Sequence, residues 1–294
     1  MMRNKDFVVL ILSHGRADRV YTYNKLRAHG YTGRIVIVLD NEDDSVDEYA
    51  RRYGVDNVVV FDKEKVAETF DEVLRGDRRT IVYARNASFD IVRGLGYRYF
   101  IQLDDDYTSF CYRFDHRLRY KKNAPAIKNL DGVFDCMLDY YKSIPAKSIA
   151  MAQGGDFIGG SESNMAKVVR LLRKAMNSFI CDTYRPFQFI GRLNEDVTTY
   201  TLRQSIGDLF FTVNQVSLNQ KQTQSNKGGI TEVYKESGAL AKPFMSIVCM
   251  PSSIKVGLVG NHHSSNQRRL HHVINWNNTV PRIINEKYKR YDKK

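Results

Sequence analysis

The sequence predicts an α/β protein with a mostly parallel central sheet flanked by helices, followed by a mixed C-terminal half. Apolar runs of strand length occur at Phe7–Ser13, Arg34–Leu39, Asn57–Phe61 and from Tyr97 onward, and segments with helical character separate them. Runs that are apolar throughout are typical of strands covered on both faces, as in parallel sheets. In such sheets ligands bind beyond the carboxyl ends of the strands.

Helices are expected between these strands, with short connections that favour right-handed crossovers. The first extends to about His29 and is closed by Gly30. The second opens with a capping box of Ser45 and Glu48 and stops at Gly54. The next two are recognised by their apolar faces, which are Val66, Phe70, Val73 and Leu74, with Gly76 behind them, and Ala84, Ala87, Ile91, Val92 and Leu95.

After Tyr107 the pattern becomes mixed, with no internal repeat and no linker. Strands or hairpins are expected at Ser109–Lys122, Ser148–Gln153, Asp208–Leu218, Ser246–Met250 and Lys255–Val259. Helices are expected at Asp131–Ser143, at Lys167–Asn177 and at Arg192–Ser205, where Asn194 is the N-cap candidate. The polar segment Gln220–Gly229 predicts a loop, and the basic tail Tyr288–Lys294 predicts a frayed end. We therefore expect one domain over residues 1–294.

Composition limits the compartment and the kind of site. The apolar run Phe7–Leu12 is too short to span a bilayer or to serve as a signal segment, so we expect a soluble, cytoplasmic protein without a membrane partner. The four cysteines lie far apart and form no CxxC pair, which argues against a structural zinc site and a disulfide scaffold. Buried free thiols are expected instead.

The net charge of +12 suggests a polyanionic partner. Nucleic acid comes first and an anionic membrane surface second, because both attract a strongly basic chain. The segment Tyr112–Lys122 alternates aromatic and basic residues, so it is a candidate for contact with a nucleic-acid strand or simply a cationic strand surface.

Three adjacent aspartates, Asp104, Asp105 and Asp106, follow the fourth predicted strand. Adjacent anions repel one another, so beside a buried strand they indicate a bound cation, although a solvated acidic turn is the simpler reading. Carboxylate oxygens suit Mg²⁺ or Mn²⁺, and phosphate oxygens normally complete such a coordination shell. The sequence therefore predicts a divalent metal with a diphosphate at this strand end.

Further candidates follow the other strands and helices. Ser13, Arg16 and Asp40 lie at the carboxyl ends of the first two strands, and Arg85 lies on the helix before the acidic strand. Arginine suits bidentate phosphate contacts, whereas the alternative for Arg16 and Arg85 is a solvated position.

Two more constellations occur late in the chain. His262 or His263 could supply a nitrogen ligand, which favours Mn²⁺ over Mg²⁺, or could be a surface pair. Glu195 and Asp196 follow Asn194 at a helix start, where one carboxylate could cap the helix while the other acts as a general base.

Taken in order, the motifs are SHGR and LD after the first two strands, Arg85-Asn86-Ala87, LDDDY, a GGD loop, NED and a late histidine. Their combination resembles the nucleotide-sugar-dependent glycosyltransferases of the GT-A fold, which is Rossmann-like. The closer likeness is to the branch associated with modified DNA bases, namely base J glucosyltransferase and the TET/JBP-associated glycosyltransferases of bacteriophages. The motifs span residues 7–263, and each is short, so their order carries the specificity.

The resemblance implies a nucleotide-sugar-binding half, residues 1–107, and an acceptor and catalytic half, residues 108–294. For the donor, it implies that Asp40 contacts the nucleoside, that Arg16 and Arg85 face the diphosphate beside Ser13, and that Asp104 touches the ribose or sugar. It implies that Asp106, with His262 or His263, binds the metal. Because Asp104 and Asp105 stand directly before it, which of the adjacent aspartates are the ligands stays open by one residue. Gly154, Gly155 and Asp156 would lie along a sugar, and Asp196 or Glu195 would be the base.

The expected reaction transfers a sugar from a nucleotide-sugar donor, a UDP-sugar first, to the hydroxyl of a 5-hydroxymethylated pyrimidine such as 5-hydroxymethylcytosine in phage DNA, with inversion. Three alternatives stay open. The acceptor could be a glycan, lipid or protein. The enzyme could be a nucleotidyltransferase, although SHGRAD is not a Gly-rich phosphate loop. The protein could also be a basic DNA-binding protein with a degenerate site.

Overall fold

The computed structural model describes residues 2–70, 78–221, 241, 243–260 and 268–280. In its first part, strands β1 (Phe7–Leu12), β2 (Ile35–Asp40), β3 (Val58–Phe61) and β4 (Tyr99–Asp104) alternate with helices α1 (Tyr21–Ala28), α2 (Val46–Tyr53), α3 (Lys63–Ala67) and α4 (Val82–Gly94). A short 3₁₀ turn, η1 (Val55–Asn57), precedes β3. These four strands pair in parallel in the order β3-β2-β1-β4. The predicted parallel alternation is confirmed.

The later strands extend the same sheet with mixed directions. They are β5 (Tyr107–Tyr112), β6 (Ser148–Gln153), β7 (Leu171–Leu172), β8 (Ser178–Asp182) and β9 (Phe210–Gln220), with helices α5 (Leu130–Ser143) and α6 (Glu195–Ser205) and turns η2 (Gly154–Phe157) and η3 (Gly160–Glu162). Among the described residues the sheet has nine strands, in the order β3-β2-β1-β4-β8-β6-β9-β5 with β7 beside β9. Strand β8 runs antiparallel between β4 and β6, so the carboxyl ends of β4 and β6 lie at the same edge.

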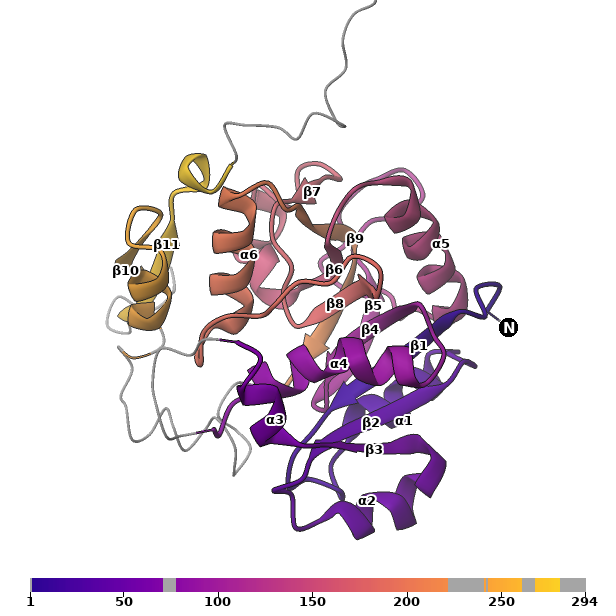
Figure 1. The fold of residues 1–294 in the computed structure, drawn as a ribbon. Helices are drawn as coiled ribbons and strands as arrows, with labels where there is room; N and C mark the ends of the chain where they lie inside the picture. Colours follow the sequence, from indigo (N-terminus) through magenta and orange to yellow (C-terminus); the bar gives the residue numbers. More distant parts are fainter. Residues whose placement is uncertain (1, 71–77, 222–240, 242, 261–267, 281–294) are drawn as a thin grey trace, which may run out of the picture.

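Helices cover both faces of the sheet, as the fully apolar strands predict. Side chains alternate along a strand, so Phe7, Val9 and Ile11 of β1 pack with α1, α2 and α5. Val8, Leu10 and Leu12 point the other way and pack with α4 and α6. The result is the three-layer arrangement visible in Figure 1.

A separate antiparallel hairpin, β10 (Ile254–Gly260) and β11 (Arg268–Ile274), lies beside α6 at the flank of the molecule (Figure 1). It is followed by the turn η4 (Trp276–Thr279), whose Trp276 stacks on Tyr200 of α6 with ring centroids 5.9 Å apart. Ile254 is buried in the same cluster as Tyr200. The hairpin therefore fixes the outer face of α6, whose first turn carries Glu195 and Asp196.

Several predicted elements are wrong or incomplete. Residues 167–177 contain only the short strand β7 rather than a helix, residues 243–249 are helical rather than a strand, and β8 was not predicted. Ser45 occupies the N-cap position of α2, but its hydroxyl donates to Asp43 Oδ1 at 2.5 Å instead of capping the helix. Of the four thiols, Cys136 is exposed, contrary to the expectation that all are buried.

Other predictions fall outside the described residues. These are the apolar positions Val73 and Leu74 with Gly76, most of the loop Gln220–Gly229, the pair His262 and His263, and the tail Tyr288–Lys294.

Candidate active site

Strand register brings the acidic segment and the first two strand ends to one edge. Leu12 pairs with Asp104 on one side and with Val38 on the other, so Ser13, Asp40 and the aspartates after β4 are neighbours at the carboxyl ends of adjacent strands. This is the edge at which parallel sheets bind ligands. The structure thus brings together the residues that the sequence placed at separate strand ends.

The backbone of the aspartate turn is fixed by Thr22 of α1, which is fully buried. Its hydroxyl donates to the carbonyl of Asp104 at 2.6 Å and accepts from the Tyr107 amide at 2.9 Å. Its own amide donates to the carbonyl of Asp105 at 3.1 Å. One threonine therefore satisfies the polar groups on both sides of the turn, which leaves the three carboxylates with defined directions.

Asp104 points into a buried charge network. Arg85 of α4 is only 1% exposed, and it donates from Nη2 to Asp104 Oδ1 at 3.1 Å and from Nε to Glu195 Oε1 at 2.9 Å. Burial raises the pKa of Asp104 to about 7, although Arg85 opposes the shift. The resemblance implied that Arg85 faces the diphosphate, whereas in this structure its guanidinium is enclosed by the carboxylates of Asp104 and Glu195. Arg85 instead positions Asp104 against the start of α6.

Asp105 turns to the other side and holds the loop after β1. It accepts from Ser13 Oγ at 2.6 Å and from Arg16 Nη1 at 3.2 Å. Ser13 Oγ also lies 2.7 Å from the hydroxyl of Tyr49, which accepts from the Arg16 amide at 2.8 Å. The Asp105 carboxylate is only 4% exposed, so its role in this structure is to anchor the loop after β1. The sequence alone did not assign a role to this residue.

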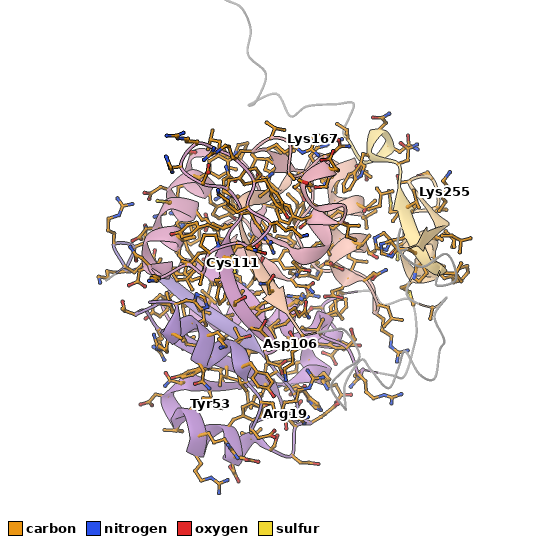
Figure 2. The ribbon with its side chains drawn as sticks, turned by 180° about the vertical axis from the view of Figure 1, so that it is seen from behind. Arg19, Tyr53, Asp106, Cys111, Lys167 and Lys255 are labelled. Carbon is orange, nitrogen blue, oxygen red and sulfur yellow. The ribbon has the colours of Figure 1, made fainter. Side chains whose placement is uncertain are left out.

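Asp106, which is labelled in Figure 2, has a different environment from both neighbours. Its Oδ2 accepts from Gln220 at the end of β9 at 3.2 Å, whereas Oδ1 is buried and has no hydrogen-bond partner among the described residues. Burial raises the pKa of this carboxyl group. A buried carboxylate oxygen without a partner is unfavourable, and a divalent cation would satisfy it, so the residues present fit a metal. The described residues contain no complete set of three His, Cys, Asp or Glu ligands, and His262 lies outside them.

Asp40 is engaged by two residues that the sequence did not single out. Its Oδ2 lies 2.9 Å from His14 Nδ1, and its Oδ1 lies 2.8 Å from Lys63 Nζ. Burial opposes ionisation of Asp40, but the hydrogen bonds to His14 and Lys63 hold its pKa below the ordinary value. The same bond raises the pKa of His14. The position of Lys63, two residues past the end of β3, was the available signal, because β3 pairs in parallel with β2, which ends at Asp40.

The GGD segment forms the 3₁₀ turn η2 after β6. Gly154 and Gly155 are exposed, and a Cβ added at either would meet nothing within 4 Å. The Asp156 carboxylate points inward, where it accepts from the Gln153 amide at 2.8 Å and forms an ion pair with Lys174. Contrary to the expectation for Asp156, its side chain stabilises the turn rather than facing a sugar.

The first turn of α6 supplies the base candidates. Glu195 and Asp196 are both buried, and Glu195 is committed to Arg85. Asn194 occupies the N-cap position with φ of 57°, but its side chain makes no capping bond and donates to Ser246 Oγ at 3.3 Å. Of the predicted N-cap, only the position is correct.

A family model for TET-Associated Glycosyltransferase matches residues 7–229, which contain the strand ends, the aspartate turn and the start of α6. The chain belongs to the TET-associated glycosyltransferase family. The prediction of a glycosyltransferase with a GT-A-like α/β fold is confirmed by this match and by the sheet described above. The match favours a glycosyltransferase over the alternatives of a nucleotidyltransferase and of a non-enzymatic protein.

Comparison with solved structures finds distant similarity. Two structures of glucosyl-3-phosphoglycerate synthase from Mycobacterium tuberculosis, one with Mg²⁺ and UDP and one with Mn²⁺, UDP and phosphoglyceric acid, each share 10% identity and a TM-score of 0.44, covering 91% of this chain and 87% and 86% of theirs. No curated protein matches the chain. Among the described residues, no helix has both the length and the apolar character needed to cross a bilayer.

Proposed function

We propose that this glycosyltransferase moves a sugar from a UDP-sugar to the hydroxyl of a 5-hydroxymethylated pyrimidine in DNA, with Mn²⁺ or Mg²⁺ at Asp106. The observation that carries the proposal is the buried Oδ1 of Asp106, which has no hydrogen-bond partner among the described residues and lies at the strand edge where Ser13, Arg16 and Asp40 also lie. The DNA acceptor is supported by the family's association with TET and by the motif resemblance to base J glucosyltransferase. The net charge of +12 suits such an acceptor.

On the donor side, Asp40, held by His14 and Lys63, faces the nucleoside, and Arg16 faces the diphosphate. Asp106 and a late histidine, His262 or His263, hold the metal, with Asp104 beside them. A bound divalent metal supplies positive charge next to the leaving diphosphate. Gly154 and Gly155 leave room for a sugar, since both are exposed and open.

On the acceptor side, Asp196 is the general base. Glu195 is the second candidate, and its carboxylate forms an ion pair with Arg85 at 2.9 Å. Asp196 accepts the proton of the hydroxymethyl group. At the same time the hydroxymethyl oxygen forms a bond to the sugar carbon. The bond from that carbon to the diphosphate breaks on the opposite side, and the electron pair leaves with the nucleoside diphosphate. Attack from that face inverts the sugar carbon, and a positioned carboxylate contributes about 10²–10⁴-fold.

A base in a duplex presents its hydroxymethyl group in the major groove, and full access to an enclosed site requires flipping of the nucleotide. The reaction is therefore expected to proceed more readily on single-stranded than on duplex DNA.

The test measures UDP release from a panel of UDP-sugars with Mn²⁺, in the presence of hydroxymethylcytosine DNA or of the same DNA with plain cytosine. The proposal predicts release that depends on the hydroxymethyl group. Metal-dependent release that is indifferent to DNA would contradict the acceptor and would favour a glycan, lipid or protein instead.

A further inference from the structure

Two segments that are distant in sequence, residues 111–122 and 154–174, form one surface next to the candidate site. Phe114 and Phe157 are buried in a small cluster with Met165, against which Tyr120 packs. Tyr120 stacks on Phe157 with ring centroids 5.5 Å apart. We call these two segments the basic surface.

The basic surface carries half of the net charge of the chain. Its segments hold nine Lys and Arg against three Asp and Glu, a balance of +6 out of +12. Asp115 forms ion pairs with Arg119 and Lys121, and Asp156 forms an ion pair with Lys174. The remaining cations form no ion pair with a described carboxylate, and they are Arg113, Arg117, Lys122, Lys167, Arg170 and Arg173. An excess of this kind attracts a polyanion.

Arg113 is the buried member of this set, with 9% exposure. Within the described part of the chain its guanidinium donates only to neutral acceptors, Ser217 Oγ at 2.6 Å and Asn219 Oδ1 at 3.2 Å, and it lies 5.0 Å from the centre of the Phe157 ring. A buried cation without a counter-charge is unfavourable unless an anion approaches it. Asn219 directly precedes Gln220, which holds Asp106, so this cation is connected to the candidate metal site.

Side chains of β9 anchor the loop that carries Lys167, Arg170 and Arg173. The buried side chain of Asn214 donates to the carbonyls of Met165 and Val168 at 3.2 Å each and accepts from the Arg170 amide at 2.9 Å. Thr212 donates to the Lys174 carbonyl at 3.0 Å. A charged surface that is already ordered loses less entropy when it binds.

We propose that the basic surface binds the phosphate backbone of the acceptor DNA and directs the strand to the edge at Asp106. This inference rests on the proposed DNA acceptor. Arginine forks suit phosphate oxygens, and the exposed apolar side chains of Leu118, Ile158 and Val168 between the cations suit contact with sugars and bases. The turn η2, which belongs to this surface, follows the carboxyl end of β6, at the same edge of the sheet as the carboxyl end of β4.

The test neutralises three exposed cations in one variant, Arg117→Gln, Lys122→Gln and Lys167→Gln. The matched control is Lys5→Gln, Arg51→Gln and Arg93→Gln, which removes equal charge from exposed positions elsewhere, Lys5 preceding β1 at the opposite edge of the sheet. Anisotropy of fluorescein-labelled single-stranded DNA measures affinity against salt. The test variant should bind about 10–100-fold more weakly at physiological salt and lose about two units of salt slope, while the control stays near wild type.

Transfer kinetics separate this proposal from the proposed function. The test variant should raise KM for hydroxymethylcytosine DNA and leave both UDP-sugar hydrolysis and melting temperature unchanged. If the test variant alone loses DNA binding but the wild type transfers no sugar, the DNA-binding role of the surface is supported and the proposed function is refuted. Equal DNA binding by both variants, or binding of anionic vesicles in place of DNA, would overturn the surface.

Discussion

Three adjacent aspartates have three different environments, which is the central feature at the residue scale. Asp104 is held by Arg85, Asp105 by Ser13 and Arg16, and Asp106 keeps one buried oxygen without a described partner. The same residue type therefore has different chemistry at successive positions, because each side chain leaves the turn in a different direction.

Asp106→Asn tests the assignment of the metal ligand. The substitution should lower kcat about 10²-fold or more, because charge on the leaving diphosphate loses its stabilisation. The rise in melting temperature on addition of Mn²⁺ should disappear, and stability without metal should not fall, since a buried charge is removed. Asp47→Asn on α2, an exposed position, serves as the control. Retention of the Mn²⁺ effect in Asp106→Asn would refute the assignment.

The roles of the two carboxylates at the start of α6, Glu195 and Asp196, can be distinguished by different measurements. Asp196→Asn should reduce kcat about 10²–10⁴-fold, as expected for loss of a general base. Glu195→Gln should instead lower the free energy of unfolding by about 2 kcal/mol, because Arg85 loses a charged acceptor. Kinetics and denaturant unfolding of both variants check this. A larger kcat loss in Glu195→Gln than in Asp196→Asn would reverse the roles.

At the scale of elements, α1 fixes the aspartate turn through Thr22. Thr22→Val keeps the shape but removes the hydroxyl that serves Asp104 and Tyr107, so the free energy of unfolding should fall by about 1–3 kcal/mol. Mn²⁺ affinity should fall with it, because the carboxylates lose their fixed directions. Thr22→Ser retains the hydroxyl and should restore both. Equal Mn²⁺ affinity in the valine and serine variants would argue against this support.

The elements that sequence predicted well are those whose pattern reflects burial on two faces. The runs at Phe7–Leu12 and Ile35–Asp40 are buried along their whole length, so composition alone identified them. Residues 167–177 have amphipathic spacing, but the distant side chain of Asn214 binds the Val168 carbonyl and the Arg170 amide, which a local pattern cannot reveal. The apolar residues at 246–250 fit a strand and a helix equally, and the helix formed.

For the candidate site, sequence located the strand-end residues but not their partners. Asp40 and the aspartates were visible because strand ends converge at one edge. The pairing of Arg85 with Glu195 spans 110 positions, and Gln220 reaches Asp106 across 114 positions, so no local pattern could predict either contact. Burial of Arg85 follows from the packing of α4 against β4 and α6.

At the scale of the whole molecule, the sheet concentrates negative charge at one edge of a strongly basic protein. Burial raises the pKa values of Asp104, Asp105 and Asp106, and that of Asp104 lies at about 7. A raised folded-state pKa means that these groups favour folding at low pH and lose that contribution as pH rises through the folded value.

Metal stabilisation should therefore grow with pH. A divalent cation competes with protons for these carboxylates, so the Mn²⁺-induced increase in melting temperature should be larger at about pH 8 than at about pH 6. Thermal unfolding with Mn²⁺ or with EDTA at each pH measures this, and Asp106→Asn should remove most of the dependence. A stabilisation that is constant or decreasing over this range would contradict the role of the carboxylates.

The most direct test of the central claim is mass spectrometry of nucleosides from hydroxymethylcytosine DNA after incubation with the protein, Mn²⁺ and a panel of UDP-sugars. The account predicts a nucleoside heavier by one sugar with at least one donor for the wild type, and none for Asp106→Asn. An unmodified nucleoside with every donor, from a protein that hydrolyses UDP-sugar in a metal-dependent manner, would contradict the DNA acceptor.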